Sequence, residues 1–482
     1  MNWKEEQIKL LQIIAAQQKE ILELRAALAE RDKIIAEQAA TIIRLTERIV
    51  ELERRLGLNS SNSGKPPSSD GFKKPVRIQS LREKSGKKPG GQFGHKGSTL
   101  EQVENPDLIE LHKTTCCPHC KTDLTDAPVI DICKKQIFDI PEIKRPLVTE
   151  HQFEIKCCPG CRNQVKTQVN EDLKAPVQYG PKTKAVVSYL NIHNLIPEKR
   201  VTQIMDSLFG MPMSDATVEN ISKTCVANIN QIVNQIGECL KTVPVKGADE
   251  SSIRIAGKTY WLHTLCNDEL VYYRVSEKRG DVPQNLTGIV VHDHFISYYA
   301  KMENVQHALC NAHHLRELKA VEEIDKEPWA KAMIRLLLLG YKKIQQNDGK
   351  ISMQWLIRFK NLYDKIVEKA IAFHEKLDAF KKPSRGRTKR RPGHNLLLRL
   401  KNRADDVLRF LNNPGVPFTN NGAEQSLRMI KVKQKVSGCF RTFDGAKNFL
   451  IVRSYTATAQ KQGFKIIDAL TCAFQETPLA LA

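Results

Sequence analysis

The first 57 residues repeat apolar side chains every seven positions, and no glycine or proline interrupts residues 4–56. One seam of this repeat consists of Ile14, Ile21, Leu28, Ile35, Ile42, Ile49 and Leu56. The second seam contains Leu10, Leu24, Leu45 and Leu52, interrupted by Gln17, Arg31 and Gln38. Isoleucine at one seam and leucine at the other favour a parallel two-stranded coiled coil, in which polar seam positions set the register. We therefore expect residues 1–57 to form a coiled-coil oligomerisation helix.

A third apolar row in this helix, formed by Ile8, Leu22, Ile43 and Val50, leaves oligomers larger than a dimer open. An amphipathic helix packed on its own domain is the alternative.

The pattern changes at residue 58, where serine, asparagine, glycine and proline replace the repeat and many basic residues follow. Such a composition buries too little apolar surface to fold alone. Residues 58–100 are therefore expected to be a flexible basic linker.

Helical periodicity dominates residues 170–243. Pro181 begins one expected helix, and Ser214 or Asp215 can cap another. A helix-turn-helix between Glu198 and Asn228 is open, since paired helices of this length are also common in bundles.

Apolar and polar residues alternate from Pro244 onward. Residues 245–255, 260–264 and 270–275 predict an antiparallel three-strand meander, and an apolar run at 288–293 predicts a further buried strand. Helical patterns follow at 310–318, 329–345, 352–379, 395–411, 421–435, 444–461 and 464–474. We expect a multidomain α+β protein, with sheet residues 244–300, a helical insertion at 301–411 and closing helices at 412–482.

One of the closing helices carries its charges on a single face. If it begins near Asn421, offsets of 0, 4, 7 and 11 place Glu424, Arg428, Lys431 and Lys435 on the same side. A carboxylate followed by a basic stripe suits a hard cation with a polyanion held beside it. The structural alternative is that Asn421 and Glu424 form a capping box, or that Glu424 and Arg428 form a surface ion pair.

The net charge of the 482-residue chain is +21, with a pI near 9.4, which indicates a polyanionic partner. We expect DNA to contact the helical region 170–243, the basic stripe on the Glu424 helix, and the run 381–391 with Lys389, Arg390 and Arg391. A solvated connector is the alternative for that run. No stretch approaches 18 apolar residues and no apolar signal region begins the chain, which favours an unexported protein outside the membrane.

Thirteen cysteines in such a protein favour thiols and metal ligands over disulfides. Two near-duplicate motifs, at 116–120 and 157–161, each contain a Cys-x-x-Cys pair. Cys117, Cys120, Cys158 and Cys161 are the expected thiolate ligands of a structural Zn²⁺ ion. Residues 101–169 are therefore expected to form a small zinc-binding module, in which intervening strands bring the two pairs together. A redox pair is the rival interpretation.

Three acidic residues stand out by position: Asp249 on the first strand, Asp293 at the end of the fourth, and Glu424 on a late helix. Their order along the meander, the fourth strand, the helical insertion and the acidic helix matches an RNase H-like catalytic core. Carboxylates this close resist ionisation unless cations offset their charges. Two Mg²⁺ (or Mn²⁺) ions about 3.5–4 Å apart would do so and clamp both reacting oxygens of a phosphodiester.

Several motifs resemble bacterial insertion-sequence transposases of the insertion sequence sixty-six family, a DDE group. They include Ala248-Asp-Glu-Ser, Val291-His-Asp-His-Phe, Cys310-Asn-Ala-His-His-Leu-Arg-Glu-Leu and Phe418-Thr-Asn-Asn-Gly-Ala-Glu-Gln-Ser-Leu-Arg, together with 59–71, 91–97 and both cysteine motifs. The resemblance covers essentially the whole chain. It implies that Asp249, Asp293 and Glu424 are the catalytic acids, and that the enzyme cuts the ends of its element and joins them to target DNA.

The resemblance further implies a bacterial, cytoplasmic, DNA-associated protein, and leaves open accessory proteins encoded by the same element. Arg428, Lys431 and Lys435 would hold flanking phosphates, and Cys310 and His313, one helical turn apart, would support the site or touch DNA. For that pair, a buried thiol and a hydrogen-bonded histidine are the structural alternative. Two other protein classes remain: a zinc-containing, coiled-coil DNA-binding regulator without catalysis, and a nuclease that cuts but does not join.

Overall fold

The computed structural model describes residues 3–63, 102–139, 146–167, 173, 175–347, 349–377 and 390–481. Lys389 and residues 64–100 of the expected linker lie outside these described residues. Contacts divide the chain into two units, one formed by Met1–Ile78 with Thr224–Ala482 and the other by Gln79–Lys223.

A single helix, α1 (Trp3–Gly57), includes the whole heptad region. Its seam side chains are exposed along the helix, from Leu10 to Leu56, as an unpaired coiled-coil strand requires. At its end, Arg54 pairs with Asp325 (3.1 Å), and Asn62 Nδ2 donates to Gly57 O (3.0 Å). Residues 58–63, which the sequence assigned to the flexible linker, form a hydrogen-bonded turn here.

Five strands form the mixed sheet of the first unit, in the order β5-β4-β3-β6-β7. The first three, β3 (Val245–Ile255), β4 (Lys258–Cys266) and β5 (Val271–Ser276), pair antiparallel and confirm the expected meander. The expected fourth strand, β6 (Ile289–His292), runs parallel to β3, and β7 (Gln306–Leu309) runs parallel to β6. Neither β7 nor the short helix α5 (Ile296–Lys301) was predicted from the sequence pattern.

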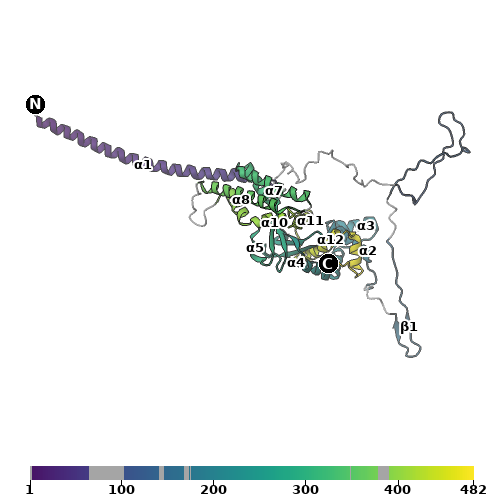
Figure 1. Ribbon diagram of the computed structural model, residues 1–482. Coiled ribbons are helices and arrows are strands. Elements are labelled where there is room, and N and C mark those ends of the chain that lie inside the picture. The colour runs from purple at the N-terminus through teal and green to yellow at the C-terminus, as the bar shows by residue number, and fades with distance from the viewer. Residues whose placement is uncertain are drawn as a thin grey trace. The chain divides into compact units, whose positions relative to one another are not determined.

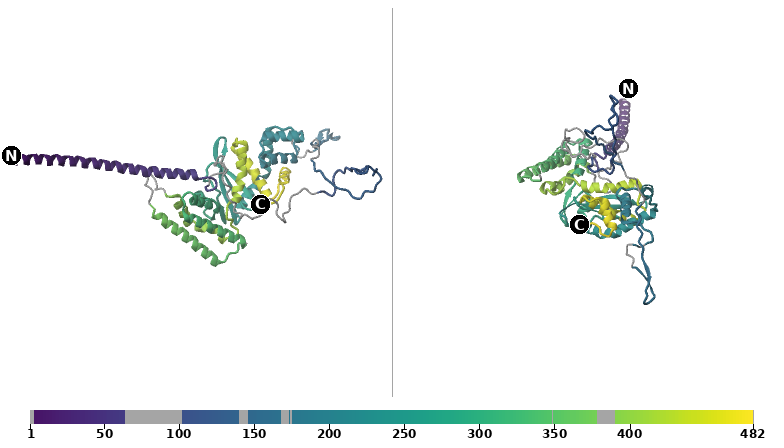
Figure 2. Two further views of the ribbon diagram at one scale, coloured as in Figure 1. Left: turned by 90° about the horizontal axis from the view of Figure 1, so that it is seen from above. Right: turned by 90° about the vertical axis from the view of Figure 1, so that its right-hand side faces the viewer.

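Helices pack along the sheet (Figure 1), and an apolar core joins β6 and β7 to the helices that follow them, up to α10. α12 (Phe443–Lys461) contacts β5, α11 (Asn421–Ser437) contacts β3 and β4, and α10 (Ala404–Asn412) contacts β7. The insertion contains α6 (Asn311–Glu323), α7 (Pro328–Gln346), α8 (Met353–Glu375) and α9 (Pro392–Asn402), and α13 (Ile466–Phe474) packs on α12. Figure 2 shows the green helices α7 and α8 side by side. This mixed sheet with its helices is consistent with the expected RNase H-like core.

The single helix expected at 395–411 is in fact two helices. Arg403 adopts φ −125° and ψ 27° and separates α9 from α10. The prediction was wrong because no glycine or proline marks this break, which the sequence pattern therefore could not reveal. Pro392 occupies the first turn of α9 and explains why that helix begins before residue 395.

The second unit contains α2 (Pro181–Ser188), the π-helical turn η2 (Tyr189–His193), α3 (Glu198–Phe209) and the beginning of α4 (Asp215–Thr242). α3 ends at Gly210 in the left-handed conformation (φ 59°), and Ser214 Oγ accepts from the backbone N–H of Thr217 (3.2 Å) as α4 begins. Two short strands, β1 (Ile155–Cys157) and β2 (Gln164–Lys166), pair antiparallel. In residues 121–139 and 146–154 the strands expected between the cysteine motifs are absent.

None of the helices in the described ranges is both long and apolar enough to cross a membrane.

Candidate active site

Asp249 and Asp293 lie just beyond the point where the parallel pairing of β3 with β6 ends. The parallel pairing of β3 with β6 ends with Gly247 opposite Val291, and Asp249 and Asp293 each follow that pair by two residues. Because side chains two residues apart in an extended chain point to the same face of the sheet, we expect both carboxylates to project from the same face. Asp249 lies within β3, just beyond its parallel pairing with β6, and Asp293 directly follows the carboxyl end of β6, where open sheets commonly place their sites.

The two aspartates are buried, and neighbouring acidic groups, including Glu424, act on their ionisation. Burial raises the pKa of Asp249 well above its ordinary value, and the charges of Glu250, Asp293 and Glu424 raise it further. Burial also raises the pKa of Asp293 to about 6, with contributions from Glu250 and Glu424. Asp249 and Asp293 are therefore each within electrostatic reach of Glu424, although in the described residues the three carboxylates do not form a group with all ligand atoms within 4.8 Å of one another.

Asn420 fixes the start of α11 against the sheet. Its Nδ2 donates to Ala248 O (2.7 Å), and its backbone N–H donates to Cys310 Sγ (3.1 Å). A Cβ atom at Gly247 would lie 2.6 Å from Asn420 Oδ1, so this close approach requires glycine. Asn420 is the residue before the first helical position, and its side chain makes no capping hydrogen bond. The capping box considered for Asn421 and Glu424 is therefore wrong.

A fourth carboxylate, Glu250, lies beside these carboxylates but is already paired. Its side chain is 1% exposed, accepts a hydrogen bond from the Tyr298 hydroxyl (2.6 Å) and pairs with Arg279 (2.7 Å). The Arg279 guanidinium in turn lies 4.1 Å from the centre of the ring of Phe295, two residues after Asp293. Sequence reasoning missed Glu250 and Arg279, although Glu250 directly follows Asp249 in the Ala248-Asp-Glu-Ser motif.

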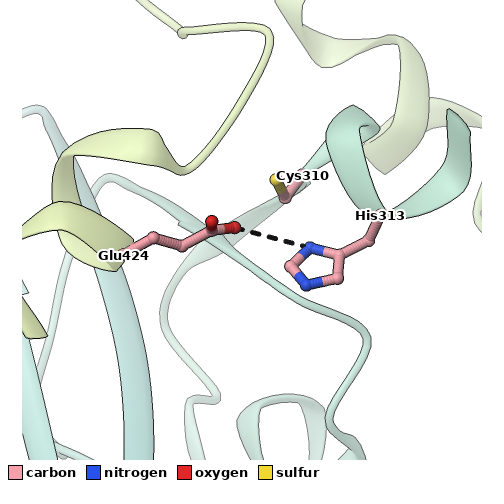
Figure 3. A group of neighbouring side chains, drawn as sticks. All are labelled: Cys310, His313 and Glu424. Atoms are coloured by element: carbon pink, nitrogen blue, oxygen red, sulfur yellow. Dashed lines mark ion pairs between the residues drawn. The ribbon is translucent and has the colours of Figure 1, made fainter. Parts of the chain in front are cut away.

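The pair Cys310 and His313 lies opposite Glu424, at the start of α6 (Figure 3). His313 Nδ1 is 3.8 Å and Arg316 Nη2 is 3.9 Å from Glu424 Oε1. These separations are too long for hydrogen bonds, and within the described chain Glu424 Oε1 and His313 Nδ1 are buried atoms without a hydrogen-bond partner. Burial lowers the pKa of His313 to about 4 and raises the pKa of Cys310 to about 11, so both side chains are neutral at pH 7.

A cavity of about 230 Å³ opens beside Asp293 and His313. Arg279, Phe295 and Arg399 contribute to its wall. Both guanidinium groups are paired, Arg279 with Glu250 and Arg399 with Glu317, which also lines the cavity.

The basic residues expected to hold DNA differ in their surroundings. On α11, Arg428 and Lys435 are exposed, whereas the Lys431 ammonium is half-buried and donates to Ser252 O. Burial lowers the pKa of Lys431 from its ordinary value. Arg390 is exposed and Arg391 immediately precedes α9.

Both cysteine motifs form the same backbone turn. Lys121 N–H donates to Cys117 O (3.0 Å), and Arg162 N–H donates to Cys158 O (2.8 Å). Hydrogen bonds from Thr122 lower the pKa of the Cys120 thiol to about 7, and the backbone N–H of Cys161 lowers the pKa of Cys158. Within the described residues the four expected zinc ligands do not gather into one group, and the cluster that could hold a metal is Cys310, His313 and Glu424.

The residues present suit a divalent cation bound by oxygen. Asp249 and Asp293 resist ionisation without a neighbouring cation, and Glu424 presents a buried oxygen that nothing in the described residues satisfies. A mixed five-stranded sheet packed with helices, with two buried carboxylates just beyond the pairing of two parallel strands, is consistent with the class of proteins that have an RNase H-like core.

Comparison with known families gives a more specific identity. Residues 176–448, more than half of the chain, match the family model described as Transposase IS66 family. The chain belongs to this family of DDE transposases, which confirms the resemblance expected from the sequence. Residues 9–101 match a second model, described as a family of unknown function (DUF6444). A search of curated proteins found no match.

Proposed function

We propose that the chain is a transposase that cuts DNA at the ends of its element and joins the freed ends to target DNA. Asp249, Asp293 and Glu424 are its catalytic carboxylates. The observation that carries the proposal is that Asp249 and Asp293 follow the β3–β6 pairing at equivalent positions, and that burial together with the charge of Glu424 raises the pKa of both. Membership of the transposase family supports the same assignment.

The three acids would hold Mg²⁺ or Mn²⁺, which when bound supplies charge neutralisation and activation of the attacking oxygen. Asp249 and Asp293 provide ligands on the rigid sheet, and Glu424 provides one from α11. Asn420 maintains that arrangement, because it joins the start of α11 to Ala248 and Cys310. Cys310 would therefore help to position Glu424, because its sulfur accepts the hydrogen bond from the Asn420 backbone. Cleavage and joining need no covalent enzyme intermediate, so no Ser, Tyr or Cys nucleophile is required.

Basic side chains would hold the DNA. The exposed Arg428 and Lys435 continue from Glu424 along α11, and contacts to phosphates from them would add affinity without sequence information. Lys431 would contribute its charge from a position fixed by Ser252. Lys389, Arg390, Arg391 and the helical region 170–243 would extend the contact to flanking DNA.

A structural Zn²⁺ ion would join the two cysteine motifs. Cys117, Cys120, Cys158 and Cys161 are its ligands in this proposal, supported by the identical turns and by the lowered pKa values of Cys120 and Cys158. The exposed seam of α1 would pair with a second copy of the chain, making the active protein a homo-oligomer. Accessory proteins from the same element are further candidate partners.

The test uses the purified full-length chain, Mg²⁺, and DNA carrying the ends of the element that encodes it. Wild type should release the ends and join pre-cut ends to target DNA. Asp249→Asn should lower both rates about a thousandfold or more while DNA binding is retained. Asp268→Asn, in an exposed turn, is the matched control and should behave like wild type.

Each of three results would contradict the proposed transposase function or its catalytic residues. Binding without cleavage by wild type would point to a regulator. Cleavage without joining of pre-cut ends would point to a nuclease. Unchanged cleavage by Asp249→Asn would remove the proposed catalytic carboxylates from the reaction.

A further inference from the structure

Cys310, His313 and Glu424 have the composition of a transition-metal site. Their sulfur, nitrogen and oxygen atoms lie within 4.8 Å of one another. A thiolate and an imidazole favour Zn²⁺ over Mg²⁺, which prefers oxygen ligands throughout. The oxygen cluster at Asp249 and the mixed ligands beside it therefore differ in the cation that they select, although Glu424 belongs to both.

The separation of the polar atoms fits a shared ion better than an ion pair. His313 Nδ1 and Glu424 Oε1 are 3.8 Å apart, and neither has a hydrogen-bond partner in the described part of the chain. Two ligands of one tetrahedral Zn²⁺ ion lie about 3.5 Å apart, given its usual bond lengths. Figure 3 shows the Glu424 carboxylate directed at the His313 ring, and the Cys310 sulfur lies near both groups.

The local backbone holds these ligands in place. Cys310 immediately precedes α6 and His313 lies in its first turn, so the spacing of three residues puts both on one side of the helix start. The backbone N–H of Asn420 donates to Cys310 Sγ (3.1 Å), an interaction that stabilises a thiolate bound to metal. Arg316 lies 3.9 Å from Glu424 Oε1 and makes no hydrogen bond to it, so it leaves that oxygen available.

We propose that Cys310, His313 and Glu424 form a second metal site, which binds Zn²⁺ and thereby inhibits the Mg²⁺-dependent reaction. Binding releases the Cys310 thiol proton to solvent, and a water molecule or phosphate oxygen completes the tetrahedron. Zn²⁺ there engages Glu424 and repels the cations that Asp249 and Asp293 hold. Zinc binding itself does not depend on the proposed function, whereas the inhibition rests on the proposed role of Glu424.

The first experiment counts bound metal and needs no activity. Full-length wild type, Cys310→Ser and His313→Ala are dialysed against a limiting free Zn²⁺ concentration, and zinc per chain is measured by elemental analysis. Wild type should bind one zinc more than either variant. Cys225→Ser removes an equally buried cysteine from α4, away from this cluster, and should match wild type. Equal zinc content in all four proteins would overturn the site.

The second experiment measures cleavage in constant Mg²⁺ with increasing Zn²⁺, each protein relative to its own rate without zinc. The zinc concentration for half-inhibition should rise about ten- to a hundredfold in His313→Ala. The same half-inhibition concentration in wild type and His313→Ala would overturn the inhibitory role. If wild type does not cleave at all, the proposed function fails, and the zinc count still decides the metal site.

Discussion

At the scale of single residues, the raised pKa of Asp293 predicts a stability effect with a definite sign. The folded protein releases this proton only near pH 6, whereas the ordinary value is 3.8. Between these values the folded state binds more protons than the unfolded state, so stability falls as pH rises through the window. In metal-free protein, Asp293→Asn should therefore raise the free energy of unfolding at pH 7.5 by up to about 3 kcal/mol.

The gain from Asp293→Asn should disappear at about pH 3 and below, where the carboxyl group of wild type is mostly protonated in both the folded and the unfolded state. Urea unfolding in the presence of a chelator, at about pH 7.5 and about pH 3, measures both values. With added Mg²⁺ at pH 7.5, wild type should become more stable than Asp293→Asn, because the cation stabilises the ionised carboxylates of wild type. A variant less stable than wild type in metal-free buffer at pH 7.5 would contradict the cause assigned to the shift.

Asn420 predicts a second effect at this scale. Asn420→Ala removes the donor to the Ala248 carbonyl and should cost about 1–3 kcal/mol, because a buried acceptor loses its partner. It should also slow cleavage, since α11 carries Glu424. Asn421→Ala, at the exposed neighbouring position, is the control and should change neither thermal unfolding nor rate. Equal effects of the two substitutions would remove Asn420 from its positioning role.

These residues also show what the sequence could reveal about the site. Asp249, Asp293 and Glu424 were predicted because each has a distinct place in the order of strands and helices. Asn420 was not, because its role depends on the approach of α11 to Gly247, a contact between segments far apart in sequence. Arg279 was missed for the same reason: its partner Glu250 is 29 residues away.

At the scale of secondary-structure elements, the seam of α1 predicts how the chain assembles. Replacing Ile35 and Ile42 together by Lys places charges in the seam and should dissociate the oligomer. Ala26→Lys with Ala40→Lys adds the same charge away from both seams and from the third apolar row, and should leave the oligomer intact. Light scattering of the full-length proteins measures the mass, and unchanged mass in the first variant would refute the coiled coil as the assembly interface.

Elements with strong periodicity could be predicted, and those defined by their neighbours could not. The meander and the long helices follow from repeats within each segment. β7 has four residues without alternation, and its pairing with β6 makes it a strand. The division between α9 and α10 likewise carries no sequence signal, since Arg403 is neither glycine nor proline.

At the scale of the whole molecule, the net charge of +21 predicts a strong dependence of DNA binding on salt. If several phosphates are neutralised, log K should fall with log salt by roughly 0.9 for each contact. The double variant Arg428→Gln with Lys435→Gln should weaken binding and reduce that slope by about 2. Fluorescence anisotropy over a salt series measures the slope, and an unchanged slope would exclude α11 from the DNA interface.

The central claim is that Asp249, Asp293 and Glu424 jointly hold the cations of the reaction. Crystals of the chain bound to its element ends, soaked in Mn²⁺, test this directly through anomalous scattering. The account predicts two manganese peaks about 3.5–4 Å apart, with all three carboxylates as ligands. Manganese bound elsewhere on the chain, with one of these three carboxylates beyond coordination distance, would contradict it.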